Sequence, residues 1–406
     1  TQRGRLDVDV LHGLFAISAD EPPQPWPTGP SAVVAPSVTI DYEEGATMHL
    51  GARPAAREPV LDMRLARPTR LVSRSGTLHP DAPADWHQIP LYPTLAAALT
   101  AVSARWSALT AADVPGPDPV EVAEVVQFED SATYPDEAPV WPAAPADAAV
   151  RALARLSLTI QSAERERPVV LVDPDAGWTA PVPAPVYDLL TLRGIALGGE
   201  DWDGMTLPAA TRVTFELCSV LHAGNALELS DLDAGTEVLV TRCETAGLTL
   251  AGTGVLTVAD SIVDAGGANA LVAEAGDIVL DRVSVGGSVA GRVLEASEVI
   301  FDGLVEVEDR FHGCVRYSRV AEDSVLPRVH RVVVGTPVRV VSRNRRDPAW
   351  WRLRADCDPA ISAGAENGSE IGAFNQTQLA QRMAGFQRRL GEFTPAGLDT
   401  GIIRID

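Results

Sequence analysis

The sequence between residues 213 and 320 carries a spacing pattern that returns six times, although no string of residues repeats. Each unit places two apolar residues around one mostly polar position, and successive units begin 25, 18, 22, 16 and 21 residues apart. Irregular steps with a constant internal register are typical of a parallel β-helix, because alternate residues of short stacked strands face the core while the turns vary in length. The six inward pairs are Val213/Phe215, Val238/Val240, Leu256/Val258, Ile278/Leu280, Leu294/Ala296 and Val315/Tyr317.

Two further columns of the pattern follow each inward pair. The first faces outward and is mostly charged, so residues of opposite sign on neighbouring coils, about 4.8 Å apart, are expected to pair. The second places Cys218 and Cys243 on successive coils, where we expect packed thiols rather than a bridge. A leucine-rich repeat has a similar repeat length, but its L-x-x-L-x-L frame is absent. The outward column comprises Leu217, Arg242, Asp260, Arg282, Glu298 and Arg319.

The charge composition limits the partners of this 406-residue chain. It has 55 acidic and 33 basic residues, every basic one an Arg, and a net charge of −22. Such an acidic balance argues against general nucleic-acid binding and against an anionic membrane surface. No run of 18 apolar residues is present, which argues against a membrane-spanning helix. Four Cys are too few for a disulfide framework, although Cys314 and Cys357 would be placed to pair in an oxidising compartment.

The chain is organised into four regions. Residues 1–90 read as a small N-terminal β domain, with short strands between Pro-rich loops. Residues 91–185 begin with an amphipathic helix, apolar at positions 95, 99, 102 and 106, which we expect to cover the open end of the solenoid before the first irregular coils. Residues 186–322 hold the regular coils. The strands expected ahead of the regular pattern are 6–10, 14–17, 37–41, 120–128, 156–160, 169–172 and 189–192.

The fourth region, residues 323–406, is an Arg-rich tail. It holds 12 Arg against 9 acidic residues, a net charge of +3, whereas the rest of the chain holds 21 Arg against 46 acidic residues, a net charge of −25. The tail is therefore electrostatically complementary to its own body. An amphipathic helix within it would either close the other end of the solenoid or dock on a neighbour. Its apolar stripe is Leu379, Met383, Phe386, Leu390 and Phe393.

Carboxylates on the coils are the candidates for enzymatic chemistry. A polysaccharide lyase on a β-helix needs clustered carboxylates for Ca²⁺ and a basic residue, and a hydrolase needs facing carboxylates on adjacent coils. Asp260 and Glu298 share a column, but Arg282 lies between them and neutralises their charge. We therefore predict no catalytic residues. The six candidates considered are Asp260, Asp264, Asp277, Asp281, Glu298 and Asp302.

The sequence also lacks a complete metal or cofactor motif. The acidic stretches 173–177 and 199–204 resemble fragments of Ca²⁺ loops, yet neither continues to the remaining oxygen ligands. His79 and His87 lie in a loop with two Asp, which is a weak pattern for a metal site. We expect neither a bound metal nor a cofactor.

Six Arg surround a Trp pair between residues 339 and 354. Guanidinium and indole groups together either stack on a sugar or base, or dock on an acidic protein surface. We favour docking for a chain whose body is so strongly acidic. This candidate docking or ligand surface comprises Arg343, Arg345, Arg346, Trp350, Trp351, Arg352 and Arg354.

Six segments spread along the chain form a recognisable set: DVDVLHGLFA at 7–16, VTIDY at 38–42, YPTLAAAL at 92–99, VADSIVD at 258–264, GCVRYS at 313–318 and GAENGSEIGAF at 364–374. Together they resemble a group of bacterial pectin-lyase-like β-helical proteins associated with phage-tail-like contractile injection systems. The resemblance covers nearly the whole chain, and its motifs carry no catalytic assignment. Residues 376–382 and 401–406 depart from the pattern of the group.

The resemblance implies a right-handed, single-stranded parallel β-helix, an all-β fold with a small N-terminal β domain, a capping helix and an α-containing tail. It further implies a non-enzymatic structural component of an injection particle, in its baseplate or in a spike or fibre-like appendage, anchored by its tail. The expected partners are other particle subunits, with a cell-surface glycan or receptor and a homo-oligomer left open. The particle would be assembled in the cytoplasm or act outside the cell. The alternative is a carbohydrate-active enzyme or glycan-binding protein on the same fold.

Overall fold

The structure is a computed structural model that divides into two units, residues 1–46 with 390–406, and residues 47–389. Each unit is described by itself. The structure describes residues 5–9, 14–18 and 67–378, apart from 176–177, 179–185, 200–204, 206, 221–226, 230–234, 346, 348 and 355, together with residues 385, 388, 389 and 392.

The first unit contains an antiparallel hairpin. β1 (Arg5–Asp9) pairs with β2 (Leu14–Ser18). These strands confirm the two predicted at 6–10 and 14–17, with the small differences at strand ends that are usual. The strand predicted at 37–41 and the five apolar residues of the predicted tail helix lie outside the described residues.

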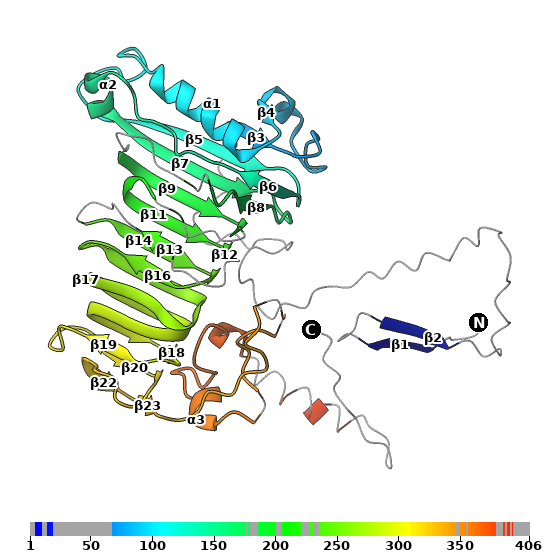
Figure 1. Ribbon diagram of the computed structural model, residues 1–406, viewed down its shortest axis with the longest axis vertical. Helices are drawn as coiled ribbons and strands as arrows, with labels where there is room; N and C mark the ends of the chain where they lie inside the picture. Colours follow the sequence, from blue (N-terminus) through cyan, green and yellow to red (C-terminus); the bar gives the residue numbers. More distant parts are fainter. Residues whose placement is uncertain are drawn as a thin grey trace. The chain divides into compact units, whose positions relative to one another are not determined.

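The second unit is a parallel β-solenoid (Figure 1). Its described strands form one sheet of 21 strands that winds around three faces, because the chain turns a corner after each strand and returns one coil further on. The all-β parallel architecture predicted from the spacing pattern is confirmed. The first face contains β3 (Arg70–Val72), β4 (Leu91–Tyr92), β5 (Val120–Phe128), β7 (Ala154–Ser162), β9 (Val186–Arg193), β11 (Ala209–Glu216), β14 (Glu237–Thr241), β20 (Cys314–Arg316) and β22 (Arg328–His330).

The long strand β17 (Val255–Ser297) joins all three faces, because its 43 residues pass around the corners of several coils without interruption. The second face contains β6 (Thr133–Glu137), β8 (Val169–Val172), β10 (Ala196–Gly198), β12 (Ser219–Val220), β15 (Glu244–Thr245), β18 (Ile300–Phe301), β21 (Arg319–Val320) and β23 (Val333–Val334). The third face contains β13 (Leu227–Leu229), β16 (Leu248–Leu250) and β19 (Val305–Val307).

Backbone pairing confirms the predicted register for the first regular coils. Val213 lies opposite Val238, and Val238 lies opposite Leu256, all three buried in one continuous core. The prediction is wrong at the last step, because Ala296 rather than Leu294 lies opposite Val315.

Gly313 explains this shift of two residues. It falls opposite Leu294, at the first inward position, where the spacing pattern requires an apolar side chain. Its φ is +85°, and a Cβ at this place would overlap the carbonyl oxygen of Leu294. The outward column of this coil therefore holds Tyr317 and not Arg319, which is buried in β21.

The outward column marks a corner at which the backbone is left-handed. Its φ values lie between 46° and 58° on each successive coil. Residues other than Gly adopt this conformation at a cost of about 1 kcal/mol each, which the stacked coils must offset. The coil before uses Gly194 at the same corner. The column comprises Leu217, Arg242, Asp260, Arg282, Glu298, Tyr317 and Arg331.

The solenoid extends beyond the range 186–322 predicted for regular coils. β22 and β23 add a further coil after residue 322. At the other end, β3 pairs with β5 although it lies within residues 1–90, the range assigned to the N-terminal β domain. The predicted early strands at 120–128, 156–160, 169–172 and 189–192 all belong to the coil stack.

The helix α1 (Leu95–Ser107) covers the core at the first coils (Figure 1). The Thr94 hydroxyl accepts a hydrogen bond from the N–H of Ala97, and the Glu137 carboxylate accepts from the first two N–H groups of the helix. The predicted apolar face is confirmed, since its members are fully buried against the coils. They are Leu95, Leu99, Val102 and Trp106.

Short helices occur at α2 (Ala148–Leu153), α3 (Pro359–Ser362), η1 (Ala84–Gln88) and η2 (Asn375–Thr377). Over the described part of the chain, no helix has both the length and the apolar character needed to cross a membrane.

Replacing Leu99 with Ala is expected to lower the free energy of unfolding by about 2–5 kcal/mol, because this side chain is fully buried between α1 and the coils. The matched control is Leu304→Ala, at a side chain that is 45% exposed. Its expected effect is below about 0.5 kcal/mol. Urea denaturation followed by circular dichroism measures both values. Equal losses would contradict the covering role of α1.

Candidate functional site

The Arg/Trp stretch predicted as a docking surface belongs to a segment that folds back onto the second face. We name residues 338–377 the clamp segment. Its apolar side chains form a separate buried cluster with Ile262 and Ile300, which project outward from the second face. The clamp segment contributes Trp350, Trp351, Leu353, Cys357, Ile361, Ile371, Ala373 and Phe374 to this cluster.

Trp351 is fully buried at the centre of the contact. Its Nε1–H donates to Asp264 Oδ2 at 2.7 Å. The Arg343 guanidinium lies over the indole, with Cζ 4.2 Å from the ring centroid, and its Nη1 is 2.9 Å from Asp302 Oδ2. An indole bound to a carboxylate, together with a guanidinium that both stacks and pairs, fixes one orientation of the clamp segment.

Arg345 binds three successive coils at once. Its guanidinium donates to the backbone carbonyl oxygens of Val220 at 3.3 Å, Thr245 at 3.5 Å and Asp264. Its Cζ lies 5.4 Å from the ring centroid of Trp350. Burial lowers the pKa of Arg345, but the group remains a cation at neutral pH because an Arg pKa starts so high.

The two other described members of the predicted surface differ in exposure. Arg352 is buried, and Arg354 forms an ion pair within the clamp segment. Arg346 lies outside the described residues. Because Trp350 and Trp351 are 5% and 0% exposed, neither ring is presented to a ligand. The acidic surface on which the segment docks is its own solenoid.

Sequence reasoning did not find the surface that receives the clamp segment. Ile262 and Ile300 occupy outward positions of the second face, where polar residues are expected, and both are buried. Apolar residues at such positions signal that something covers them. They do not say what covers them, because the contact between Arg345 and Asp264 joins residues 81 positions apart.

Glu370 is a carboxyl group of the clamp segment with only 3% of its surface exposed. Burial raises the pKa of Glu370 to about 7, and the nearby positive charge of Arg352 opposes this only in part. Its backbone carbonyl accepts a hydrogen bond from Asn375 Nδ2 at 3.0 Å. The clamp segment therefore contains a group that gains or loses a proton near neutral pH.

All four cysteines are free thiols. Cys218 and Cys243 are buried on successive coils, where the N–H of Cys218 donates to Cys243 Sγ at 3.4 Å, as predicted for packed thiols. Burial raises the pKa of Cys243 well above its usual range. The structure shows no bridge between Cys314 and Cys357, because the first lies in β20 and the second packs into the apolar cluster of the clamp segment.

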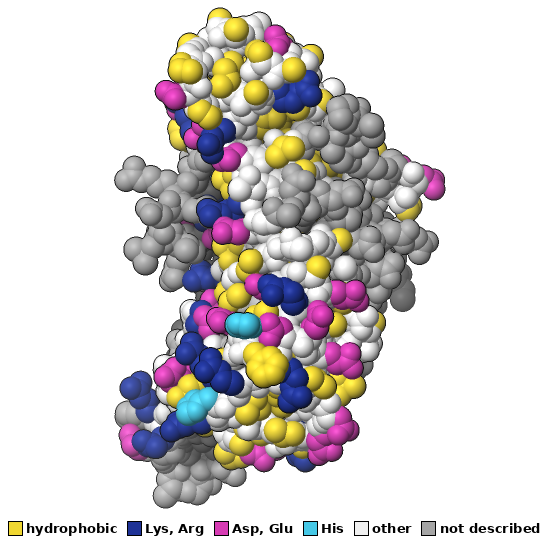
Figure 2. Space-filling model, turned by 90° about the vertical axis from the view of Figure 1, so that its left-hand side faces the viewer, with side chains coloured by type: hydrophobic (Ala, Val, Ile, Leu, Met, Phe, Trp, Pro, Cys, Tyr) yellow, Lys and Arg dark blue, Asp and Glu magenta, His cyan; other side chains and the backbone are white. Residues whose placement is uncertain are grey.

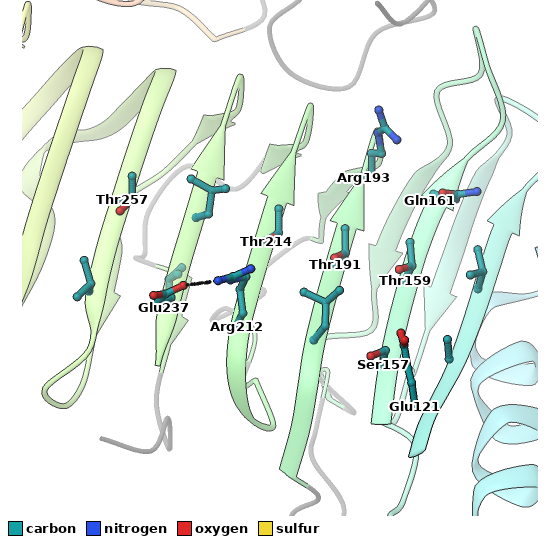
Figure 3. A pocket seen from close by; sticks show the side chains of 16 residues that line it. Glu121, Ser157, Thr159, Gln161, Thr191, Arg193, Arg212, Thr214, Glu237 and Thr257 are labelled. Atoms are coloured by element: carbon teal, nitrogen blue, oxygen red, sulfur yellow. Dashed lines mark hydrogen bonds and ion pairs between the residues drawn. The ribbon is translucent and has the colours of Figure 1, made fainter. Parts of the chain in front are cut away.

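A groove of about 690 Å³ runs across the outer side of the first face. Figure 3 shows its labelled side chains on successive strands from β5 to β17. Thr159, Thr191 and Thr214 lie directly opposite one another, and Leu239 and Thr257 continue the row. The sequence analysis missed this threonine row because its members lie between the two residues of an inward pair, at a position that holds both polar and apolar residues. The recurrence of Thr at this same position in successive coils was the signal that could have revealed the row.

Two ion pairs connect neighbouring coils at the groove. Arg212 in β11 lies 2.8 Å from Glu237 in β14, and Arg193 in β9 lies 3.1 Å from Glu216 in β11. Figure 3 shows the first pair bridging two strands. The groove thus offers hydroxyl, amide and apolar groups along its length, with Glu121 exposed at one end.

The six coil carboxylates considered for catalysis all have donors. Asp260 lies 2.6 Å from Arg282 Nε, which confirms the predicted neutralisation of charge in this column. Glu298 accepts a hydrogen bond from the N–H of Glu366 at 2.9 Å. The remaining four pairs are Asp264 with Trp351, Asp277 with Arg292, Asp281 with Arg282, and Asp302 with Arg343.

Among the residues that the structure describes, no group of three or more His, Cys, Asp and Glu side chains could hold a metal ion. His79 faces Glu166 at 3.4 Å, and Asp85 pairs with Arg67 at 2.6 Å, so the loop of His79 and His87 brings these side chains to other partners. Most of residues 199–204 and part of 173–177 lie outside the described residues.

Comparison of the chain with protein-family models, with curated proteins and with solved structures finds no match, so no role is transferred to any of these residues. Two places therefore stand out on physical grounds alone. They are the contact between the clamp segment and the second face, and the groove on the first face.

Trp351→Phe is expected to destabilise the protein by about 1–3 kcal/mol, because it leaves the buried Asp264 carboxylate without the indole N–H. Trp350→Phe is the matched control, since Trp350 Nε1 has no hydrogen-bond partner in the described part of the chain. Amide hydrogen exchange across the clamp segment measures its local opening. Equal protection in the two variants would contradict the role of the Trp351–Asp264 bond.

Glu370→Gln is expected to change how stability depends on pH. The folded pKa of Glu370 is about 7 and its ordinary value is 4.5, so between these pH values the folded state holds a proton that the unfolded state has lost. The contribution of Glu370 is therefore fully present below pH 4.5 and is lost as the pH rises to 7, by on the order of 1 kcal/mol or more. In the Gln variant the free energy of unfolding does not fall in this way, because Gln has no proton to lose.

Urea unfolding at several pH values tests this expectation. The stability of the Gln variant relative to the wild type should increase from pH 4.5 to pH 7 and level off above it. A difference that does not change with pH would show that Glu370 does not titrate in this range.

Proposed function

We propose that the protein is a non-enzymatic structural subunit of a larger protein particle. The observation that carries the proposal is the clamp contact, in which one segment is bound across coils from Val220 to Asp302 by a buried Trp, two Arg and an apolar cluster. Solenoid coils otherwise contact only their immediate neighbours. A segment that binds several coils opposes bending and local opening, as a load-bearing part requires.

Ion pairs between coils support the same interpretation. Arg212 with Glu237 and Arg193 with Glu216 each connect two strands of the first face. The exposed pair contributes little by itself, and the buried pair places Arg193 and Glu216 side by side on neighbouring coils. The sequence resemblance supports a particle of the phage-tail-like contractile type, with this subunit in the baseplate or in a spike or fibre-like appendage.

The coil carboxylates give less support to a hydrolase or lyase. Glycoside hydrolysis uses two facing carboxyl groups, one of which needs a raised pKa to act as the acid. Here Arg282 separates Asp260 from Glu298, and the side-chain bond to Asp260 raises the pKa of Arg282. That arrangement suits a permanent ion pair.

The clamp contact changes the role proposed for the tail. The resemblance implies that the tail anchors the protein, yet residues 338–377 are bound to the solenoid itself. We therefore assign the contact with neighbouring subunits to the coils and their turns. Phe311 is one exposed group of this kind, at 91% exposure in a turn held by hydrogen bonds to Asp309.

Glycan binding without cleavage is the second candidate function. The threonine row places a hydroxyl group on most coils along the groove, beside the paired Arg212 and Glu237. Hydroxyl, guanidinium and carboxylate groups at regular intervals suit a polyhydroxylated chain that lies across the strands.

The structural proposal predicts that the protein sediments with intact particles when lysates of the producing cells are fractionated on a density gradient. Its ratio to the other particle proteins should stay constant across the particle fractions, as measured by quantitative mass spectrometry. Trp351→Phe should be incorporated less than Trp350→Phe, because it opens the clamp contact. Recovery of the wild type in the soluble fractions alone would contradict the proposal.

Incubation with a panel of glycans separates the alternatives. The structural proposal expects no new reducing ends and no unsaturated products. Binding without turnover that Thr191→Trp abolishes would favour the second candidate, because the larger side chain fills the groove. Turnover would identify an enzyme.

A further inference from the structure

The last coil of the solenoid ends in an open edge. β22 pairs with β20, and β23 pairs with β21, while no described strand pairs with the other side of either. In a parallel sheet the backbone groups of alternate residues point to opposite sides. His330 and Val333 bond to the preceding coil, so Val329 and Val334 direct their N–H and C=O groups away from it.

The core is uncovered at the same place. Val315 and Val320 face inward one coil earlier and are 0% and 1% exposed. Val329 and Val334 lie directly opposite them and are 56% and 60% exposed. An edge that combines free backbone groups with exposed β-branched side chains is the kind to which a further strand adds.

The other end of the solenoid is closed. Leu99 and Trp106 of α1 are fully buried over the first coils. The chain thus covers one end with its own helix, whereas no residue of the described part of the chain adds a strand at the other end. Two copies therefore cannot stack head to tail through free coils, because one of the two ends in such a contact carries α1.

Two Arg side chains lie along the open edge, and Glu322 of the preceding coil lies beside Gly335 at its end. Arg328 and Arg331 are exposed, and neither forms an ion pair with a described residue, although Arg331 lies over the ring of Tyr317 at 5.5 Å. Figure 2 shows Arg side chains gathered over the lower part of the second unit, where the last coils lie. Earlier coils pair opposite charges at outward positions, as Arg212 does with Glu237. A rung complementary to this edge would therefore carry Asp or Glu.

We propose that the open edge of β22 and β23 binds an extended acidic segment of another protein, which adds a further rung to the solenoid. Backbone hydrogen bonds to Val329 and Val334 hold the added strand, and its carboxylates pair with Arg328 and Arg331. This inference rests on the proposed function, since it gives the chemistry of a neighbouring subunit. A second copy fits poorly, because two such edges would bring the same Arg side chains together.

The test uses the purified full chain and three capped synthetic peptides. They are Glu-Val-Glu-Val-Glu-Val-Glu, its counterpart with Arg in place of Glu, and an acidic peptide with a central Pro that prevents strand pairing. Fluorescence anisotropy measures binding, and hydrogen exchange measures protection of residues 328–335. The acidic strand peptide is expected to bind and to slow exchange there. The other two should bind at least about tenfold more weakly.

Three variants locate the binding surface. Arg328→Glu combined with Arg331→Glu should reverse the preference toward the basic peptide. Val329→Pro should abolish binding of either peptide, because it removes an outward N–H without breaking a bond to β20. Leu304→Ala, away from the edge, should leave binding unchanged. The charge reversal keeps the test decisive if Val329→Pro fails to fold.

Equal binding of all three peptides, or binding of none, would overturn the proposal. A dimer in light scattering that Val329→Pro abolishes would identify a second copy as the occupant instead. Slow exchange at the edge that becomes fast after deletion of residues 379–406 would identify the C-terminal segment of the chain itself. The two proposals can fail independently. The peptides are tested on the isolated protein, so their failure to bind would contradict the strand-addition proposal without changing the result of the particle fractionation. Absence of the protein from particles would contradict the structural proposal without changing the result of the peptide test.

Discussion

The alignment of inward residues from coil to coil is the constraint on which the rest of the structure depends. A solenoid coil is too small to bury a core by itself, so its apolar residues are buried only where the next coil repeats them at the same position. Val213, Val238 and Leu256 meet this requirement. The thiol contact, the ion pairs and the threonine row follow from the same alignment, because it brings equal positions of neighbouring coils to about 4.8 Å.

The clamp segment adds contacts of longer range to this nearest-neighbour design. Arg345 bonds to carbonyl groups on three coils, Trp351 binds the carboxylate of Asp264 on the third of them, and Arg343 binds the carboxylate of Asp302 further along the second face. Opening one of these coils therefore breaks contacts that the clamp segment makes with the others, which increases the cooperativity of unfolding. The buried carboxyl of Glu370 links this cooperation to pH, because its ionisation is unfavourable inside the clamp segment.

Features with a short period could be predicted from the sequence. The inward pairs follow the two-residue period of a strand, α1 follows the period of a helix, and the pair of Asp260 and Arg282 follows one coil step. Gly313 defeated the pattern because its backbone, not a side chain, occupies the inward position. The clamp contact could not be predicted, because its partners share no period. Six Arg around two Trp indicated a docking surface but not the face that receives it.

The left-handed corner has a consequence for how such a protein changes over evolutionary time. Leu, Arg, Asp, Glu and Tyr all occupy this corner with nearly the same φ, so the corner is determined by the stack around it and not by the residue that occupies it. The turns likewise differ in length from coil to coil. Substitutions can therefore accumulate at most outward positions while the backbone keeps its course. Two descendants of one ancestor would retain the same shape long after their sequences had ceased to resemble each other.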